Sequence, residues 1–235
     1  MTEQVRISKL LAHRGLCSRR EADSYLEKGL VRVDGRIAQL GERVSPDASI
    51  TLEGAAVRRQ RERVTILLHK PVGYVSGQPE PGYESAHVLL TPDRQLGPGP
   101  RPPRHLAVAG RLDIDSQGLL VLTDDGRTAR HLIGGQGVEK EYLVRVRRPI
   151  DDAALNILRG PLTLDGQALR PVGVWRLGPD YLRLVLTEGR KRQIRRMLQG
   201  IGHDVMNLKR VRIGDVRLGG LPVGRWRYLT ADEHF

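Results

Sequence analysis

Charged and hydroxyl side chains gather in one short polar segment between two apolar runs. Apolar residues 106–109 precede the segment and apolar residues 119–122 follow it. Between them, residues 110–120 read G-R-L-D-I-D-S-Q-G-L-L and hold four side chains suited to chemistry: Arg111, Asp113, Asp115 and Ser116. Two buried strands joined by such a turn would hold a carboxylate and a guanidinium at the edge of a core, as a catalytic acid requires. An ordinary hairpin turn uses the same residue types, so spacing alone leaves both interpretations open.

The composition is strongly basic. Lys and Arg number 39 against 27 Asp and Glu, for a net charge of +12 and a sequence pI of about 10.5. Such an excess favours a polyanion, either nucleic acid or an anionic membrane surface. No apolar run approaches the ~20 residues that a membrane helix needs, and the first residues show no apolar signal segment. We therefore expect a nucleic-acid partner and no membrane association.

Cysteine and histidine usage bounds the chemistry further. Cys17 is the only cysteine, which excludes an internal disulfide and a Cys-based zinc site and fits a reducing cytoplasm. The seven histidines show no metal-ligand spacing, so we expect no metal site.

Half of the net charge lies in residues 187–212. This segment holds eight cations against two carboxylates, a balance of +6. In and just after the stretch 187–198, Ile194, Met197, Leu198 and Ile201 follow the spacing i, i+3, i+4, i+7, which predicts an amphipathic helix that Gly200 and Gly202 end. A solvated helix face is the usual explanation of a charge run, but so lopsided a run favours contact with an RNA backbone.

The first 58 residues predict a small module of two helices and a hairpin. Ser18 and Glu21 have the spacing of a capping box, and Asp34-Gly35 is a strong turn signal. Arg19 and Arg20 fall in the first turn of the second helix, where the helix dipole disfavours cations, and this placement indicates a use such as phosphate contact.

The rest of the chain predicts an α+β domain with a mixed, largely antiparallel sheet flanked by helices. Residues 59–63 are charged and free of apolar side chains, which indicates a linker, so we divide the chain into 1–58, 59–63 and 64–235. Residues 64–68, 140–146 and 181–186 have strand patterns. Residues 76–105 carry seven of the fourteen prolines and predict a long surface loop with a short helical turn near residues 88–90.

The N-terminal motifs resemble a known RNA-binding module. R-I-S-K-L-L-A-H-R-G-L-C-S-R-R-E-A and G-L-V-R-V-D-G are similar to the module first known from small-subunit ribosomal protein four, over residues 5 to about 53. The resemblance implies that two helices and a hairpin pack against RNA. It places four basic residues on the contact surface: Arg6, Lys9, Arg19 and Arg20.

Four further motifs resemble one enzyme family over residues 64–235. They are H-K-P-V-G-Y, G-R-L-D-I-D-S-Q-G-L-L-V-L-T-D-D-G, E-K-E-Y-L-V, and E-G-R-K-R-Q-I-R-R-M-L followed by G-H-D-V. Their order and spacing are similar to ribosomal RNA pseudouridine synthases that carry the ribosomal-protein-four module. The combination is most similar to the subgroup that acts on large-subunit RNA.

The resemblance implies a chemistry that uses one carboxylate and no cofactor. The glycosidic bond of uridine breaks, the uracil turns, and its carbon 5 bonds to the sugar, with no redox change. The family pattern assigns the carboxylate to Asp113, as nucleophile on the sugar or as base toward the 2′ hydrogen. A lone buried carboxylate would tend to protonate, so it needs a fixed cation, which the resemblance supplies as Arg195.

The resemblance also assigns positions around the substrate. Tyr142 would stack on the target uracil and Ile194 would pack beneath it, although both also suit an ordinary core. Arg111 would help to displace the flipped nucleotide, since flipping costs a few kcal/mol. Arg192 and Lys70 are further expected substrate-binding residues, with a structural pair as the other interpretation of Lys70.

Two other classes of function stay open on the sequence. A non-catalytic RNA-binding assembly factor would use the same basic patches, and a hydrolytic N-glycosidase would release free uracil. Our first expectation remains a cytoplasmic, monomeric enzyme that converts a uridine of ribosomal RNA, more readily of the large subunit than of the small one.

Overall fold

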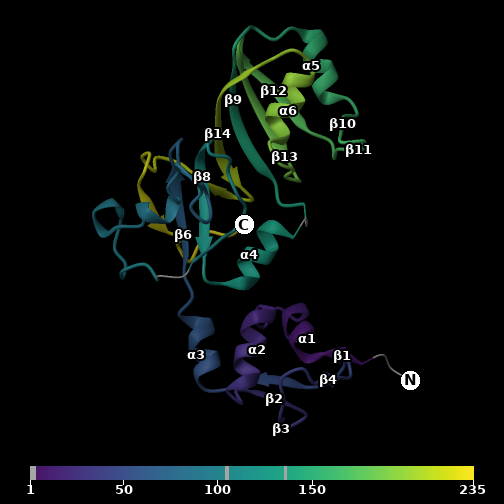
Figure 1. The fold of residues 1–235 in the computed structure, drawn as a ribbon, viewed down its shortest axis with the longest axis vertical. Helices are drawn as coiled ribbons and strands as arrows, with labels where there is room; N and C mark the ends of the chain where they lie inside the picture. Colours follow the sequence, from purple (N-terminus) through teal and green to yellow (C-terminus); the bar gives the residue numbers. More distant parts are fainter. Residues whose placement is uncertain (1–3, 104–105, 135–136) are drawn as a thin grey trace.

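The computed structural model describes residues 4–103, 106–134 and 137–235 (Figure 1). The N-terminal module, residues 4–61, has its own buried core beneath its first two helices, α1 (Ile7–His13) and α2 (Arg19–Glu27). Ser18 Oγ accepts the Glu21 N–H, and the Glu21 carboxylate accepts the Ser18 N–H, so the predicted capping box is confirmed. The elements of this module are α1 (Ile7–His13), α2 (Arg19–Glu27), α3 (Ala55–Arg61), the pair β1 (Val5–Arg6) and β4 (Arg43–Val44), and a sheet ordered β3 (Arg36–Ile37), β2 (Val31–Val33), β5 (Ile50–Leu52).

A nine-stranded sheet organises the described part of the chain after residue 64. Its strands run antiparallel except for β8 and β14, which pair in parallel, so the predicted α+β class with a largely antiparallel sheet is confirmed. The order is β12 (Gly173–Gly178), β13 (Tyr181–Leu186), β9 (Lys140–Val146), β14 (Val205–Ile213), β8 (Gln117–Thr123), β6 (Thr65–Lys70), β16 (Trp226–Tyr228), with β15 (Val216–Arg217) on β14 and β7 (Ala107–Val108) on β8.

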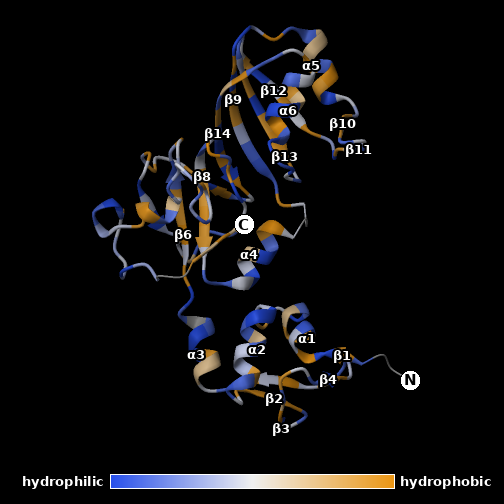
Figure 2. Cartoon of the chain, viewed as in Figure 1, coloured by the Kyte–Doolittle hydropathy of each residue, from blue (hydrophilic) through white to orange (hydrophobic). Residues whose placement is uncertain are grey.

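Helices cover this sheet unevenly. α5 (Asp152–Arg159) and α6 (Gln193–Gly200) pack on β9, β12 and β13 and form one core with them (Figure 1). Separate clusters lie on the two faces of β6 and β8. Because both faces of β8 are covered, residues 118–123 are buried, and this strand is a continuous hydrophobic run in Figure 2. The small hairpin of β10 (Thr163–Leu164) and β11 (Gln167–Ala168) completes this end.

Helix α4 (Gly126–Ile133) lies between the sheet and the N-terminal module (Figure 1). Asp125 begins the helix, and its carboxylate accepts the Arg127 N–H at 2.9 Å. No helix in the described ranges is long and apolar enough to cross a membrane.

Three expectations about local structure need adjustment. Most of the predicted linker is helical, because α3 continues to Arg61. The predicted helix in 187–198 begins only at Gln193, because Arg192 has a left-handed backbone (φ 53°) that interrupts a right-handed helix. The proline-rich stretch is a long loop that holds two 3₁₀ turns, η1 (Ala86–Leu89) and η2 (Pro92–Arg94), and its residues 104–105 lie outside the described residues.

Candidate active site

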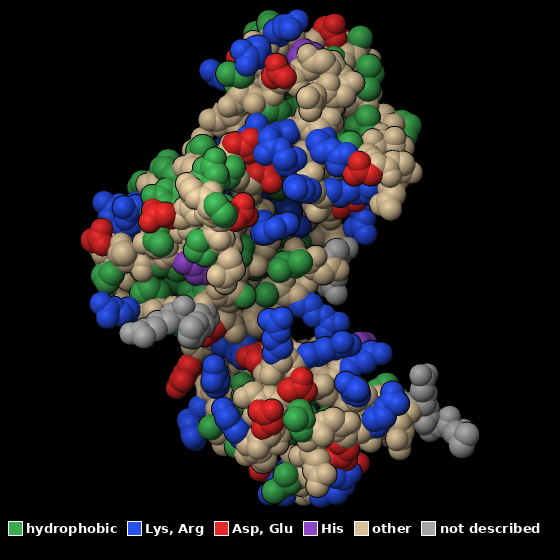
Figure 3. Space-filling model, in the orientation of Figure 1, with side chains coloured by type: hydrophobic (Ala, Val, Ile, Leu, Met, Phe, Trp, Pro, Cys, Tyr) green, Lys and Arg blue, Asp and Glu red, His purple; other side chains and the backbone are tan. Residues whose placement is uncertain are grey.

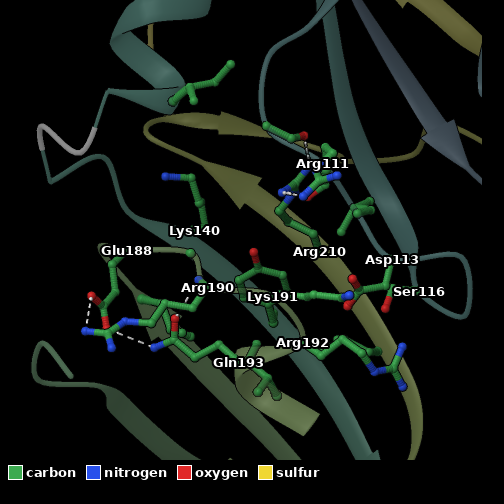
Figure 4. Close-up of a pocket in the computed structure, with 18 of the residues that line it drawn as sticks. Arg111, Asp113, Ser116, Lys140, Glu188, Arg190, Lys191, Arg192, Gln193 and Arg210 are labelled. Carbon is green, nitrogen blue, oxygen red and sulfur yellow. Dashed lines mark hydrogen bonds and ion pairs between the residues drawn. The ribbon is translucent and has the colours of Figure 1, made fainter. Parts of the chain in front are cut away.

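A cavity of about 490 Å³ opens where the loop before β8 meets β9, β14 and the loop before α6 (Figure 4). We call it the catalytic cavity. The last residues of α4 also border it. It brings together five of the residues expected at the site, from segments far apart in the sequence: Arg111, Asp113, Tyr142, Arg192 and Ile194.

Asp113 stands at the start of a tight turn, in which the Ser116 N–H donates to the Asp113 carbonyl at 3.1 Å. Its side chain is half-buried and lines the catalytic cavity (Figure 4). Within the described ranges, the structure records no hydrogen bond or ion pair to this carboxylate. Asp113 is therefore a carboxylate that faces the cavity with its oxygens available.

Asp115, two residues later, holds the cations instead. Arg192 donates two hydrogen bonds to its oxygens, at 3.1 and 2.8 Å. Arg195 Nε lies 3.2 Å from Asp115 Oδ2, and Arg195 also donates to the Asp115 carbonyl at 2.7 Å. The predicted ion pair between Arg195 and Asp113 is therefore wrong, because the turn directs Asp115, and not Asp113, toward the start of α6.

The electrostatics of Asp115 follow from this arrangement. Burial alone would raise its pKa, but the Arg192 hydrogen bond and the charges of Arg195 and Arg192 outweigh burial and hold the pKa below its ordinary value. Both guanidiniums stay close enough to interact electrostatically with Asp113 as well. The cavity is thus positively biased, while the cavity-facing carboxylate is not occupied by either arginine.

Lys70 lies under the same loop and does not line the cavity. Its side chain is fully buried, and Nζ donates to the carbonyls of Pro71 and Ser116, each at 2.8 Å. Burial lowers the pKa of Lys70 to about 8, against the attraction of Asp115 and Asp113. The burial and the two carbonyl contacts favour the structural interpretation of Lys70 over substrate binding. Lys70 is a structural contact that ties the ends of the loop together.

Arg210 on β14 also binds backbone carbonyls of this loop, a role that the sequence did not predict. Its side chain is 1% exposed and donates to the carbonyls of Leu119, Arg111 and Gly110, at 2.8, 3.3 and 3.2 Å. Gly118 pairs with Arg210 across the parallel strands, and a Cβ on Gly118 would lie 2.2 Å from the Arg210 carbonyl oxygen. Close approach of the two backbones therefore requires glycine at position 118.

Tyr142 and Ile194 form an apolar side of the cavity. Tyr142 on β9 packs against two of the hydrophobic clusters and still lines the cavity. Ile194 is 5% exposed, and belongs both to the core under α6 and to the cavity lining. Each residue therefore satisfies the core interpretation and the substrate-facing interpretation at the same time.

The basic segment 187–212 is less available to RNA than its charge suggests. Six of its eight cations have partners among the described residues. Three have been described above: Arg192 and Arg195, which bind Asp115, and Arg210, which binds backbone carbonyls. Arg190 pairs with Glu188, Arg196 with Asp165, and Arg212 with Glu139 and Glu141. The cations with no such recorded partner are Lys191, which lines the cavity, and Lys209.

Two cavity residues went unassigned in the sequence. Lys140 precedes Tyr142 by two positions and donates to the Val138 carbonyl at 3.0 Å. Burial and the charge of Arg210 lower the pKa of Lys140. Gln193 lines the cavity but is buried, and its Nε2 donates a hydrogen bond to the Glu188 carboxylate at 3.1 Å. The E-K-E-Y motif contained the signal for Lys140.

In the N-terminal module, a shallow groove of about 280 Å³ gathers Arg6, Lys9 and Arg19, together with Arg43. Arg20 is exposed on α2, outside this groove. Three of the four expected RNA-binding residues thus share one surface. The described residues contain no group of three or more side chains able to hold a metal ion.

Comparison with known proteins decides the family. Residues 64–200 match the family model of RNA pseudouridylate synthases, and residues 5–50 match that of the S4 domain. The chain belongs to the RNA pseudouridylate synthase family. Accordingly the protein is an isomerase with an N-terminal S4 domain, as the motifs predicted.

Relatives of this synthase are similar along most of their length. The dual-specificity RNA pseudouridine synthase RluF of Escherichia coli (strain K12) is 36% identical over 232 residues, covering 97% of this chain and 77% of the relative. The ribosomal large subunit pseudouridine synthase B of Shigella flexneri is 39% identical over 236 residues, covering 95% and 79%. A crystal structure of a pseudouridylate synthase aligns with a TM-score of 0.65 at 26% identity and covers 96% of each chain.

Proposed function

We propose that this synthase converts a specific uridine of large-subunit ribosomal RNA to pseudouridine, with Asp113 as the catalytic residue. One observation carries the assignment: Asp113 faces the cavity without a partner among the described residues, while Asp115 binds both nearby arginines. The choice of RNA is supported by the relatives named for ribosomal large-subunit RNA and for dual-specificity RNA modification. The matched S4 domain supports RNA as the partner.

The residues of the cavity fit the steps of this isomerisation. The bond between ribose C1′ and uracil N1 breaks, the uracil turns, and C5 bonds to C1′, while C5 loses a proton and N1 gains one. Asp113 acts on the ribose, as nucleophile at C1′ or as base toward the 2′ hydrogen, and both roles need an ionised carboxylate with a free oxygen. Arg192 and Arg195 lie close enough to interact electrostatically with Asp113 while both bind Asp115, so neither occupies the Asp113 oxygens.

Substrate placement follows from the walls of the cavity. We assign the Tyr142 ring to stacking on the flipped uracil and Ile194 to the apolar surface beneath it. Arg111 is exposed at the rim, where it can occupy the space that the flipped nucleotide leaves. Arg192 binds Asp115 and lines the cavity, so its contribution to substrate binding acts through charge at the rim.

The N-terminal module supplies affinity, and residues 64–235 supply the chemistry, in this proposal. The basic groove formed by Arg6, Lys9 and Arg19 suits a phosphate backbone. We place the enzyme in the cytoplasm as a monomer, which agrees with a single, buried cysteine and with ribosomal RNA as substrate.

The decisive experiment incubates the purified protein, without added cofactor, with transcripts of both ribosomal RNAs and with isolated ribosomal subunits. Carbodiimide-blocked primer extension then maps new pseudouridines. We expect one new stop in large-subunit RNA with the wild type and none with Asp113→Asn. A stop only in small-subunit RNA would overturn the substrate assignment, and no stop in any sample would overturn the function.

Two controls separate the other classes. Release of free uracil would identify an N-glycosidase, since an isomerase retains the base. In cells that lack the gene, a ribosome-assembly defect restored equally by wild type and Asp113→Asn would identify a non-catalytic assembly factor.

A further inference from the structure

A second basic groove lies where the N-terminal module meets helix α4. It encloses about 530 Å³, and we call it the junction groove. Figure 3 shows blue side chains gathered at this junction, on the same face as the basic rim of the catalytic cavity. Among the described residues, no carboxylate lines this groove. Its basic side chains are three arginines and two histidines: Arg19, Arg127, Arg130, His13 and His131.

Specific contacts fix the geometry of this junction. The Arg63 side chain, 5% exposed, pairs with Glu21 of the module and lies 3.3 Å from Asp125 at the start of α4. Arg130 donates to the Ala12 carbonyl at 3.0 Å. A Cβ on Gly126 would lie 2.3 Å from Ser18 Cβ, so glycine permits α4 to approach the module this closely. The groove is therefore part of the docked arrangement of the two parts.

The charges in the groove are available to a ligand. Two acidic groups beside the groove are already neutralised, since Arg63 and Arg127 bind Asp125, and Arg63 binds Glu21. Asp23 is a nearby carboxylate with no salt bridge recorded in the described part of the chain, and it does not line the groove. Arg19 and Arg130 have no carboxylate partner among the described residues, and both are exposed. Unpaired arginines on a fixed surface favour an anion that presents several charges in a row, as a nucleic-acid backbone does.

Helix α4 connects this groove to the site of chemistry. Its first residues and its middle line the junction groove, whereas Leu132 and Ile133 at its end line the catalytic cavity. Eight residues of helix span about 12 Å, which corresponds to about four nucleotides at about 3.4 Å of axis per nucleotide. An RNA strand that enters the catalytic cavity can thus reach the groove within a few nucleotides.

We propose that the junction groove binds backbone phosphates of the substrate RNA within about four nucleotides of the target uridine, with Arg19 and Arg130 as the principal contacts. The proposal rests on the proposed function for the identity of the RNA. It makes α4 the element that sets the distance between the target base and the RNA held by the module. The docked module then acts as part of a continuous RNA surface and selects RNA that follows this path.

The test compares two double variants that each remove two positive charges. Arg19→Gln with Arg130→Gln removes the proposed contacts. Arg130→Gln alone is measured beside it and should lower the slope by about 0.7 to 0.9, because Arg19 also lines the groove of Arg6 and Lys9 whereas Arg130 lines the junction groove and not that one. Arg148→Gln with Arg217→Gln is the matched control, because both residues are exposed and lie outside the groove. The dissociation constant for a large-subunit ribosomal RNA transcript is measured between low and moderate salt, after thermal melting has established that each variant is folded.

We expect the groove variant to lower the slope of log affinity against log salt by about 1.4 to 1.8, the value for two lost phosphate contacts, and the control to keep the wild-type slope. Phosphate ethylation interference should lose its signal at phosphates within about four nucleotides of the target only in the groove variant. Equal slopes in the wild type and the groove variant would overturn the proposal. An equal loss in both double variants would overturn it too, since it would reflect general charge.

A second variant tests the docking without removing charge. Gly126→Ala should separate α4 from the module and lower the salt slope in the same direction. Unchanged binding by a folded Gly126→Ala protein would contradict the composite surface. Binding is read without conversion, so a wild type that binds with the expected slope but converts no uridine would refute the proposed function and leave the groove intact.

Discussion

The two carboxylates of the loop before β8 should respond in opposite ways to the same substitution. Asp113→Asn and Asp115→Asn each replace one carboxylate oxygen by an NH2 group of similar size, which removes the negative charge. Asp113 has no recorded partner among the described residues, so its substitution should leave stability unchanged and remove conversion. Asp115 accepts two hydrogen bonds from Arg192 and faces Arg195 at 3.2 Å, so its substitution should destabilise the protein.

The magnitude follows from the exposure of the groups. A hydrogen bond to a charged group contributes about 1.5–3 kcal/mol when well shielded. The Asp115 and Arg192 side chains are 38% and 41% exposed, whereas Arg195 is 13% exposed, so solvent screens the first pair more than the second. Discounting for this screening, we expect about 1–2 kcal/mol in total, or about 2–8 °C in melting temperature for a chain of this size.

Activity should separate the two residues further. Asp115→Asn frees the loop from α6, and misplacement of a catalytic group by about 1 Å costs about 10²-fold in rate. Single-turnover conversion at saturating RNA should therefore fall by about 10- to 100-fold with Asp115→Asn, and below detection with Asp113→Asn. RNA affinity should change little in either variant.

The pH dependence provides an internal check. The folded pKa of Asp115 is depressed, so its stabilisation is fully present above its ordinary pKa of about 3.9 and is lost as the pH falls through the lower folded value. The difference in stability between wild type and Asp115→Asn should therefore be constant near neutral pH and shrink in acid. Equal destabilisation by both substitutions, or measurable conversion by Asp113→Asn, would refute the division of roles.

Three further substitutions test the support of the loop. In the wild type, stability should rise by about 3 kcal/mol between pH 8 and about 10.5, because the unfolded lysine keeps its proton over this range while the folded one, with a pKa of about 8, releases it. Lys70→Met should abolish this rise. The same pH dependence of urea unfolding in the wild type and in Lys70→Met would contradict the prediction. Gly118→Ala should lower the free energy of unfolding by about 3 kcal/mol or more. The backbone at this position has a φ of 113°, and an added Cβ would lie 2.2 Å from the β14 backbone. A urea midpoint equal to that of the wild type would argue against this close strand pairing. Arg210→Lys should cost about 2–4 kcal/mol and slow conversion, because one ammonium cannot replace a guanidinium that binds three carbonyls.

Local sequence signals predicted much of the scaffold because their causes are local. The capping box at Ser18 needs only two side chains and adjacent backbone, and the apolar run of β8 records burial on both faces. The spacing around Ile194 predicted the apolar face of α6. The exact start of that helix was not predicted, since the left-handed backbone of Arg192 accompanies its long-range pairing with Asp115.

The buried cations were beyond such signals. Lys70 and Arg210 bind backbone carbonyls, and every residue of the chain except its end offers the same carbonyl group, so no side-chain pattern marks the partner. Their burial depends on two strand pairings that are distant in the sequence: the registers place Lys70 opposite Gly118, and Gly118 beside Arg210. A charge count treats both as surface cations and so overstates the positive charge offered to RNA.

The exchange of partners between Asp113 and Asp115 also changes the logic of the site. An Asp113 bound directly to Arg195 would have its oxygens occupied and unavailable to a ribose. With Asp115 as the bound carboxylate, the arginines are fixed in place and still act on Asp113 through space. A single carboxylate could not both hold the nearby arginines and keep its oxygens free to react. Here Asp115 holds the arginines, and Asp113 keeps its oxygens free. If Asp113 is the catalytic carboxylate, as we propose, Asp115 is therefore expected to be needed for the rate through its hold on the arginines.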